Sequence, residues 1–571
     1  MNRRCVSASA VNPSFTIDSA LLYAHIDTTY NSGDFVLLEQ STECHNCPLV
    51  KVCSLRHSTT KLLVDTTFKS VIAVNNSQGG IINCSPSPIH FGEYGHYNLT
   101  INDTSCTISE VRSPVNSHTP IYWAFLAYLT LALVYGTALI CFNRFRRVFT
   151  NPRITESDSD RLLVDLAAPV PRKRRLGFLD TFRGICIVIM IFVNYGGGHY
   201  WFFKHSSWNG LTLADLVFPW FMFVMGVSMA LSFEKAAMSA SFSKYRVLVS
   251  VVRRSAILFL LGMFVINSNG SKNSWANLRI MGVLQRFAIA YLFVACLRLF
   301  SLKTASHIRG MQNNMSSLAG AFVDVLVYWT DYLIVGVLLL IWCLIMFLLP
   351  VPGCPSGYLG PGGLDDGGHF ANCTGGAAGY IDRLLLGDSH VHRRPSCYHL
   401  YRTTQRFDPE GILGCITSIF TVFLGLQAGQ IFLVFESKKM QMKRLWYWAV
   451  IYGVGGGILC KFSQNDGFLP VNKNLWTPSF ALVLSSLALL IISVLYYTID
   501  DKEWWCGEPF YFVGMNSILL YVGHEVFEKC LPVQWEVPMN HSAQLFMSLW
   551  GASFWTVIAY AFHLNKFYLS L

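Results

Sequence analysis

Long apolar runs separated by short polar segments make up most of the chain after residue 120. Most of these runs come close to the roughly 20 residues that an α-helix needs to cross the hydrocarbon core of a bilayer. The pattern predicts eleven transmembrane helices, at 121–142, 180–198, 213–233, 247–266, 280–300, 326–349, 411–435, 445–460, 477–499, 509–526 and 545–564. Such an arrangement is typical of a polytopic α-helical membrane protein.

The first 120 residues follow a different pattern. Short runs rich in β-branched and aromatic residues recur between turn residues, at 35–38, 61–64, 68–74, 96–101 and 106–111. Strand-length runs at this spacing favour a small β-sandwich-like domain. The predicted organisation is a lumenal β-rich domain over 1–120, a first transmembrane helix over 121–142, a cytosolic linker over 143–179 and a ten-helix transmembrane domain over 180–571.

Composition agrees with a chain that lies largely in lipid. Charged residues make up 13% of it, against about 25% in soluble domains. The net charge of +10 does not by itself indicate nucleic-acid binding, because basic and aromatic residues gather here at helix ends, where membrane interfaces favour both. We therefore expect a lipid bilayer, and no nucleic acid, among its partners.

The orientation in the membrane follows from the loops. Arginine and lysine residues cluster after the first helix and in alternate loops thereafter, and such loops face the cytosol. The glycosylation sequons at Asn98, Asn102 and Asn372 all fall on the opposite side. Both signals predict a lumenal N-terminus and a cytosolic C-terminus. A lumenal N-terminal domain requires a leader peptide, and no apolar leader core follows Met1, so we expect this sequence to lack its leader.

The sequence holds 17 cysteines, and those in polar segments bear on the compartment. Cys44 and Cys47 have a C-x-x-C spacing, but no second pair follows at zinc-finger spacing, so zinc is disfavoured. Beside glycosylation sequons, disulfides are the better interpretation. We expect oxidised cysteines at Cys84, Cys106, Cys354 and Cys373. A bridge from the N-terminal domain to a loop of the membrane domain would keep that domain docked.

The polar segment between the second and third predicted helices is the strongest candidate for a functional site. It contains Asn194, three successive glycines, Lys204, His205 and Asn209. Polar and ionisable groups at the mouth of membrane helices are costly unless they are paired or functional. Their concentration in one short hairpin therefore favours a working site there.

His205 and Asn194 each allow two interpretations. Histidine titrates near neutrality and is the usual proton shuttle, although an interfacial histidine can also simply bond to backbone. Asparagine can donate a hydrogen bond to a developing oxyanion, or it can end a helix before a glycine turn. The residue types alone leave both alternatives open.

Other polar residues lie within the apolar segments. Asp180, Arg183, Asp215 and Arg286 either pair inside the bundle or line a polar passage across the bilayer. Arg183 falls at the cytosolic end of its helix, where a guanidinium could bind a phosphate.

Two further stretches could line a sugar site. One is the segment with Asn516 and His524, and the other is the polar turn with Asn472. The long glycine-rich loop 350–410 could cover such a site from the lumen. We find no P-loop, dinucleotide fingerprint or HExxH motif in the sequence.

Read together, these stretches resemble the heparan-alpha-glucosaminide N-acetyltransferase family of lysosomal membrane enzymes. The resemblance covers about 120–571 and rests on DTFRG, FVNYGGG, KHSSWNGLTLADLVFPWF, GVLQR, PVPGCPSGYLGPGG, NCTGGAAGYIDRLLLGD, DPEGILG, GFLPVNKNLW and GMNSILLYVGHEVFE. The N-terminal domain is more loosely similar, through the cysteines near 44–53 and FGEYGHYNLT. Departures at 390–406 put loop details and dimer contacts in doubt, and not the chemistry.

The resemblance implies a reaction and its partners. Cytosolic acetyl-CoA is the co-substrate, no metal takes part, and the acetyl group passes to the amine of a terminal non-reducing α-D-glucosamine of heparan sulfate in the lysosomal lumen. A homodimer in the lysosomal membrane is implied as well. The family's active histidine corresponds to His205 in KHSSWNG, and its supporting asparagine corresponds to Asn194 in FVNYGGG.

We assign the remaining candidates accordingly. Acetyl-CoA binding is expected at Arg183, Lys204 and Arg286, and sugar binding at Asn209, Asn472, Asn516 and His524. The competing class is a transporter or channel of the same topology, which would keep the charged helices but would need no placed histidine.

The agreement of basic loops with sequons generates a test of the orientation. We expect glycans on Asn98 and Asn372 and none on the sequon at Asn314, which falls on the cytosolic side. Glycopeptide mapping of the purified protein measures this directly. Sugar on Asn314 would contradict the assigned orientation.

Overall fold

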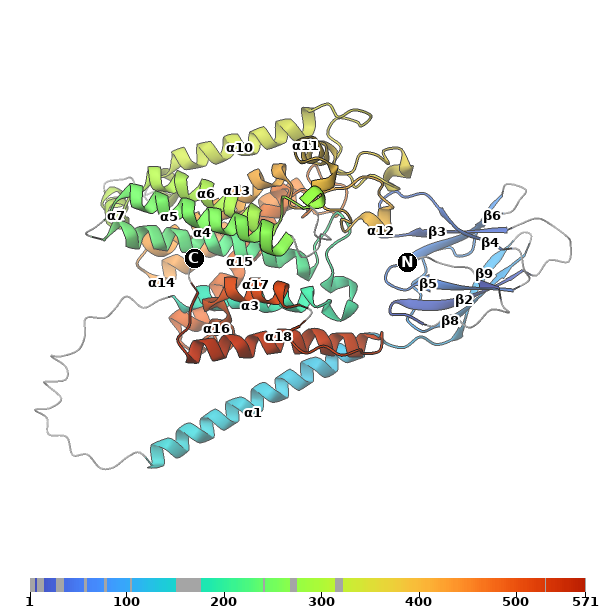
Figure 1. The fold of residues 1–571 in the computed structure, drawn as a ribbon, viewed down its shortest axis with the longest axis horizontal. Helices are drawn as coiled ribbons and strands as arrows, with labels where there is room; N and C mark the ends of the chain where they lie inside the picture. Colours follow the sequence, from blue (N-terminus) through green and yellow to red (C-terminus); the bar gives the residue numbers. More distant parts are fainter. Residues whose placement is uncertain are drawn as a thin grey trace, which may run out of the picture.

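The computed structural model contains two parts, a β domain and a bundle of long helices, with helix α1 (Thr119–Phe149) leading from one to the other (Figure 1). The structure describes residues 6–7, 15–26, 35–55, 59–75, 80–102, 105–149, 176–239, 242–267, 275–313, 322–528 and 530–569. Most of the predicted linker and the Asn314 sequon lie outside the described residues.

Two sheets form the β domain. The five-stranded sheet has the order β1 (Val6–Ser7), β5 (Thr59–Asp65), β2 (Ser19–Ile26), β8 (His96–Ile101) and β9 (Cys106–Arg112). The four-stranded sheet has the order β4 (Val50–Leu55), β3 (Phe35–Ser41), β6 (Ser70–Asn75) and β7 (Ile81–Asn83). All neighbouring strands run antiparallel except β2 and β8, which are parallel.

Alternation of apolar residues builds this domain. In β3 Phe35 and Leu37 are buried, and in β5 Leu62 and Val64 are buried, while their neighbours are more exposed. The five predicted strands are confirmed as β3, β5, β6, β8 and β9. The central strand β2 was not predicted, because its largely buried run SALLYAHI lacks a clear alternation.

Nine helices in the described part of the chain are long and apolar enough to cross a membrane. They are α1, α3 (Gly177–Asn194), α4 (Leu213–Ala237), α5 (Lys244–Leu261), α6 (Val283–Ser301), α10 (Trp329–Leu348), α13 (Ile412–Val434), α15 (Pro478–Leu495) and α18 (His541–Leu564). The fold class, a polytopic helical protein with a small N-terminal β domain, is confirmed.

The other two predicted spans require a correction to the count of eleven. Helix α14 (Lys438–Leu459) begins with basic residues, which shorten its apolar part. The span predicted at 509–526 is divided into α16 (Phe510–Met515) and α17 (Ser517–Val526), because Asn516 between them is not helical. Its side chain bonds Phe567 O at 2.9 Å and Leu569 N at 3.0 Å, which compensates for the broken helix.

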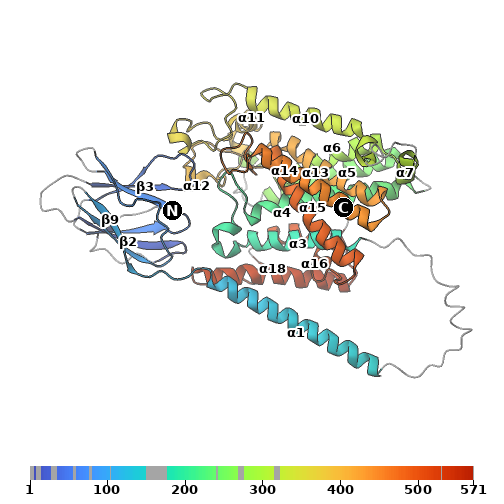
Figure 2. The ribbon, with the colours of Figure 1, turned by 180° about the vertical axis from the view of Figure 1, so that it is seen from behind.

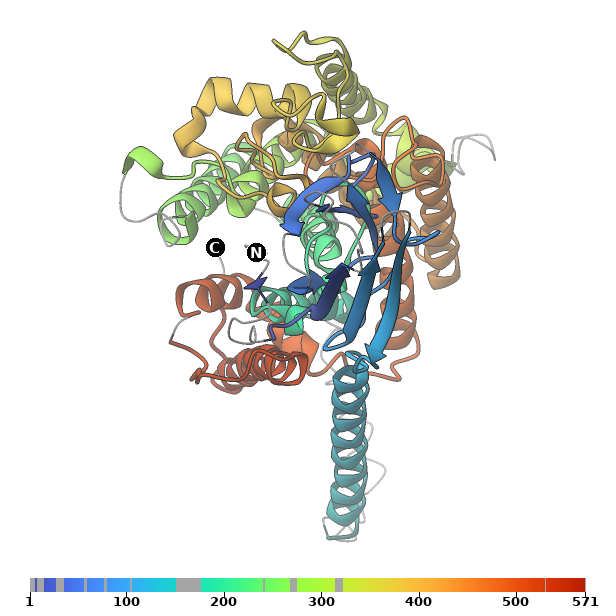
Figure 3. The same cartoon turned by 90° about the vertical axis from the view of Figure 1, so that its right-hand side faces the viewer.

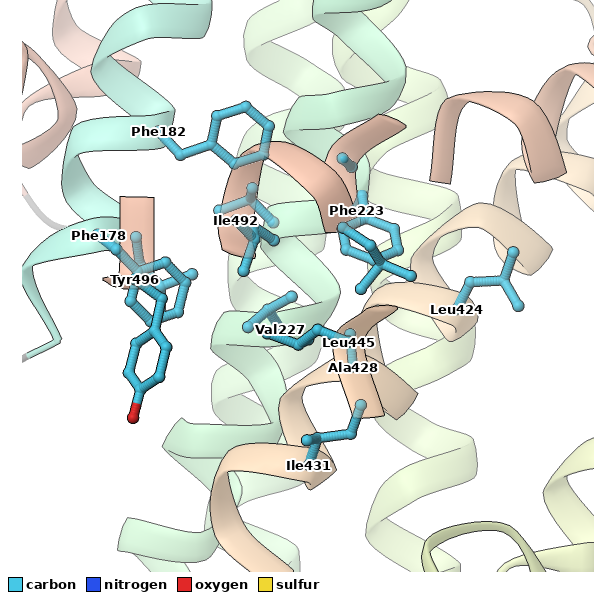
Figure 4. Packing of buried hydrophobic residues seen from close by; sticks show 14 of the residues in the cluster. Phe178, Phe182, Phe223, Val227, Leu424, Ala428, Ile431, Leu445, Ile492 and Tyr496 are labelled. Atoms are coloured by element: carbon cyan, nitrogen blue, oxygen red, sulfur yellow. The ribbon is translucent and has the colours of Figure 1, made fainter. Parts of the chain in front are cut away.

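The centre of the bundle is the contact between α4 and α13. A Cβ on Gly226 would lie 2.1 Å from Val422 O, and one on Gly425 would lie 2.0 Å from Phe223 O, so only glycine allows the two backbones to come this close. Around this contact packs an apolar cluster that includes Phe223 and Val227 (Figure 4). Helix α1 meets α18 near its start, where the hydroxyls of Tyr128 and Ser553 lie 2.6 Å apart, and then points away from the bundle (Figures 2 and 3).

The β domain sits against one end of the bundle, beside the loop between α10 and α13 that carries α11 (Gly376–Leu386) and α12 (Tyr398–Tyr401) (Figure 1). We call this the β-domain end. There the buried His541 lies 3.2 Å from Asp18 and 3.5 Å from Glu93, two carboxylates of the β domain. Asn98, Asn102 and Asn372 all lie in parts that gather at this end.

Where both cysteines lie among the described residues, disulfides join Cys44 to Cys47, Cys84 to Cys106 and Cys354 to Cys373. The expected oxidation of the last four cysteines is therefore confirmed. None of these three disulfides ties the β domain to the membrane helices, and Cys397 in the loop is a buried free thiol. Polar bonds such as Gly367 N to Asn46 O at 2.9 Å contribute to the contact between the two parts.

The Cys84–Cys106 disulfide closes a segment of the β domain between β7 and β9. Replacing both cysteines by serine should lower the free energy of unfolding of this domain by about 3 kcal/mol, since the unfolded chain regains the entropy of an open loop. Thermal unfolding in detergent measures the loss. Cys141→Ser, an exposed free cysteine of α1, is the matched control and should leave the midpoint unchanged.

Candidate functional site

His205 belongs to a compact group of charged side chains at the β-domain end. Its Nδ1 lies 2.8 Å from Oδ1 of Asp215 and 3.1 Å from Nζ of Lys473, and its Nε2 lies 3.2 Å from the same Nζ. The side chain of His205 is 44% exposed, whereas Asp215 is fully buried. The imidazole is therefore bonded by buried or nearly buried groups on one side, and the rest of the ring is open to solvent. We call His205, Asp215 and Lys473 the His205 cluster.

Local sequence explains why Asp215 is in place. Thr212 and Asp215 form a capping box at the start of α4. Backbone N–H groups of Ser206 and Thr212 donate to Oδ2 of Asp215 at 3.0 and 3.2 Å, and the Thr212 hydroxyl donates at 3.0 Å. These bonds satisfy a buried carboxylate and orient it toward His205.

The pairing with Asp215 has a chemical consequence. A carboxylate that accepts from Nδ1–H leaves the lone pair on Nε2, where the imidazole can act as a base or a nucleophile. Lys473 is a donor beside that nitrogen and could stabilise negative charge that develops next to it. The sequence pointed to His205, but nothing local to it pointed to Lys473.

Two predicted sugar-binding residues lie beside this cluster. Asn472 Nδ2 donates to Asn209 Oδ1 at 2.9 Å, and Asn209 Nδ2 donates to Asn465 Oδ1 at 2.9 Å. The turn with Asn472 also carries Lys473, so this chain of amides connects the hairpin of His205 to the turn before α15. Their predicted role in binding sugar stays a prediction.

Asn194 lies in a second group and not beside His205. Its Nδ2 is 2.9 Å from Nε2 of His524 and 2.7 Å from Oε1 of Glu525. In this structure the amide of Asn194 therefore bonds His524 and Glu525, and its role in supporting His205 stays a prediction. Helix α3 ends at Asn194 and α17 ends just after His524, so the two helix ends bring this pair together.

A cavity of about 460 Å³ lies inside the bundle and is lined from α3 to α6, α16 and α17. Arg183 and Arg254 are its basic groups, and most of the rest of its wall is apolar. Phe218 in the wall follows Asp215 by three residues, and Tyr521 precedes His524 by three residues, so each wall residue lies about one helical turn from one of the histidine groups.

The remaining predicted residues occupy different places. Lys204 pairs with Asp18 of the β domain at 3.7 Å and does not line the cavity. Arg286 is buried, donates to Gly411 O at 3.1 Å and lies over the ring of Trp476, 4.9 Å from its centroid. Asn516 holds the C-terminal segment. Neither Lys204 nor Arg286 lines the cavity with Arg183, which bonds Asp180 at 3.0 Å and Ser228.

A buried charge network, not singled out in the sequence, supports the β-domain end. Arg279 bonds both Asp408 and Glu410, at 2.9 and 2.5 Å. Burial would raise the pKa of Glu410, but the charges of Arg279, Lys473 and Arg286 outweigh it and lower that pKa to about 2. Asp408 and Glu410 both belong to the motif DPEGILG. The glycine of this motif packs closely against Asp382, because a Cβ on Gly411 would lie 1.9 Å from a carboxylate oxygen of Asp382.

Asp382 provides a pH test of this network. Burial raises the pKa of Asp382 to about 7, although Ile412 N donates to it at 2.8 Å. A raised pKa means that the folded state binds this proton more tightly, so the contribution is lost as pH rises from about 4 through about 7. Asp382→Asn keeps an acceptor for Ile412 and should flatten the fall in thermal midpoint between pH 5 and about 8. An unchanged pH profile would contradict this.

Curated proteins resemble this chain over nearly its whole length. It is 38% identical over 595 aligned residues to a mouse "Heparan-alpha-glucosaminide N-acetyltransferase", covering 98% of this chain and 89% of that protein. It is 39% identical over 591 residues to the human protein of the same name, covering 97% of this chain and 88% of that protein. No family model matches the chain.

Proposed function

Since the chain belongs to the heparan-alpha-glucosaminide N-acetyltransferase family, we propose that it moves the acetyl group of acetyl-CoA to the amine of a terminal α-D-glucosamine of heparan sulfate. The supporting observation is the cavity whose wall comes within one helical turn of both histidine groups. Its lining runs from two arginines to Phe218, which lies about one helical turn from the Asp215 that pairs with His205.

The residues of this cavity suit the donor. Arg183 and Arg254 match the phosphates of acetyl-CoA, and the apolar wall that includes Met190, Met225 and Phe287 matches its flexible arm. A charged donor cannot cross lipid, so a lined path is what a reaction between two compartments requires. Lys204 and Arg286 are less suited to this role, because neither of them lines the cavity.

His205 carries the chemistry in this proposal. Its Nε2 takes the proton of the attacking amine while the carbon–sulfur bond of the thioester breaks, and the departing thiolate takes a proton in turn. Alternatively Nε2 first accepts the acetyl group and then passes it to the amine. In both routes Asp215 holds the Nδ1–H and Lys473 stabilises the tetrahedral oxyanion.

The location follows from the same proposal. The β-domain end carries the predicted glycosylation sites and faces the lysosomal lumen, while the C-terminus is cytosolic. Asn209 and Asn472 beside His205 present amide groups to the sugar, and the active protein is a homodimer in the lysosomal membrane.

The function is tested with the purified chain in detergent, acetyl-CoA and glucosamine. Mass spectrometry should detect N-acetylglucosamine and free CoA in equal amounts. A transporter or channel of the same topology would release neither. Absence of transfer by well-folded protein would reject the proposed function.

His205 variants test the mechanism. His205→Asn and His205→Ala should lower turnover at least about 100-fold, the scale of a general base, and Asp215→Asn should cause a similar loss. Binding of acetyl-CoA by isothermal titration should persist, because the cavity arginines are untouched. His399→Asn, an exposed histidine of the same end, is the matched control.

Acetylated His205 trapped without glucosamine would identify the two-step route, and its absence would identify direct transfer. Near-normal turnover in His205→Ala would reject both routes and shift the assignment to His524.

A further inference from the structure

A single histidine of α18 joins the β domain to the hairpin that carries His205. Helix α18 begins at His541, beside the β domain (Figure 1). The imidazole Nδ1 lies 2.8 Å from Gly198 O in the hairpin, and Nε2 lies 3.2 Å from Asp18 and 3.5 Å from Glu93 of the β domain. Because His541 is buried, these contacts are shielded from water. We call His541 with Gly198, Asp18 and Glu93 the His541 bridge.

The partners of His541 determine its protonation state. Gly198 O is a carbonyl that can only accept, so Nδ1 carries a hydrogen. Asp18 also pairs with Lys204 at 3.7 Å, which keeps Asp18 ionised. An ionised carboxylate can only accept, so Nε2 must carry a hydrogen as well. A histidine with hydrogens on both nitrogens is a cation, and the geometry of the bridge is therefore that of the charged ring.

The groups around the bridge also suit a cation. The titratable and charged ones are Asp18, Glu93 and Tyr94 from the β domain, His199, Tyr200 and Lys204 from the hairpin, and His118, which stacks on Tyr200. The ring of Tyr200 stacks on the imidazole with centroids 4.2 Å apart, and an aromatic face attracts positive charge. Burial and the charge of Lys204 lower the pKa of His199, so this neighbour resists becoming a second cation.

Glu93 depends on the charge of His541. Burial raises the pKa of the Glu93 carboxyl, and the positive charge of His541 opposes that rise. Loss of the proton from His541 would therefore remove a cation that faces a buried carboxylate. A buried charge without its partner is costly, so the contact between the two parts would weaken.

The bridge acts on the hairpin close to His205. Lys204 directly precedes His205, and Asp18 pairs with Lys204 and with His541 at the same time. The hairpin is therefore fixed to the β domain at two places, through Lys204 itself and through the bond from His541 to Gly198 O.

We propose that His541 is a positioning residue whose proton fixes the β domain to the hairpin of His205, so that this docking is favoured at acidic pH and weakens as the pH rises. A histidine that faces carboxylates binds its proton more tightly in the docked state than in the undocked state, where it titrates near about 6.5. Docking is therefore strongest below about pH 6.5 and is lost when the docked histidine gives up its proton at a higher pH. The effect on docking stands by itself, whereas the effect on turnover rests on the proposed function.

Hydrogen–deuterium exchange of the purified full chain in detergent tests the docking, measured as protection factors that correct for the intrinsic effect of pH. Between about pH 5 and about pH 9, protection of the hairpin 195–212 should fall at least about 10-fold, the scale of one lost bond to a charged group. Protection of the strands β3 and β6 should stay constant, which distinguishes undocking from unfolding of the β domain.

Three variants separate the proton of His541 from other causes. Glu93→Gln keeps an acceptor but removes one negative charge, so the fall should move to lower pH by on the order of one unit. His541→Gln cannot be protonated and should show low protection of the hairpin without a fall. His25→Gln, an exposed histidine of β2, is the matched control and should behave as the wild type does.

A flat wild-type profile, or an equal fall in His541→Gln, overturns the proposal. If His541→Gln does not fold, Glu93→Gln decides, and an unshifted profile in that variant overturns the proposal as well.

Turnover tests the positioning of His205. In Glu93→Gln the alkaline limb of kcat should move to lower pH together with the protection profile, while the KM for acetyl-CoA stays within about two-fold. A limb that does not move while the protection profile does would overturn the positioning role. Absence of acetyl transfer by the wild-type chain would reject the proposed function alone, because exchange reports docking without turnover.

Discussion

The buried carboxylate of Asp215 is the constraint on which the candidate site depends. A charge removed from water must be paired and hydrogen-bonded, and Asp215 meets this need with three segments at once. Asp215 accepts hydrogen bonds from Ser206 in the hairpin and from Thr212 at the start of α4. It also pairs with Lys473, 3.8 Å away in the turn before α15. Removing any of these partners would leave the buried charge of Asp215 without a hydrogen bond or ion pair that it needs. The geometry around His205 is therefore fixed by the need to compensate this charge.

The bundle supplies the rigid frame for that requirement. Glycines let α4 and α13 approach until their backbones touch, and the apolar cluster around them fixes where α4 begins. The start of α13 carries the network of Arg279, Asp408 and Glu410, in which each charge has an opposite partner. Packing at the centre and ion pairing at the β-domain end thus both act on α13.

Two polar groups with different partners then lie at one end of the molecule. The His205 cluster pairs an exposed imidazole with a carboxylate and an ammonium, whereas Asn194 pairs with His524 and Glu525. The first arrangement is suited to proton transfer, and the second joins the ends of α3 and α17. The β domain lies against this end. Its Asp18 pairs with both Lys204 and His541, so the β domain borders the site.

Local pattern was enough to predict most of the membrane helices, five of the strands and the oxidised cysteines. These features depend on residues near in sequence, through periodicity, turns and capping, as with Thr212 and Asp215. The partners of the site could not be predicted in this way. Lys473 is 268 residues from His205, and His524 is 330 residues from Asn194, so only the packing of distant helix ends joins them. The same is true of the break at Asn516: its side chain bonds a C-terminal segment that no local signal connects to it.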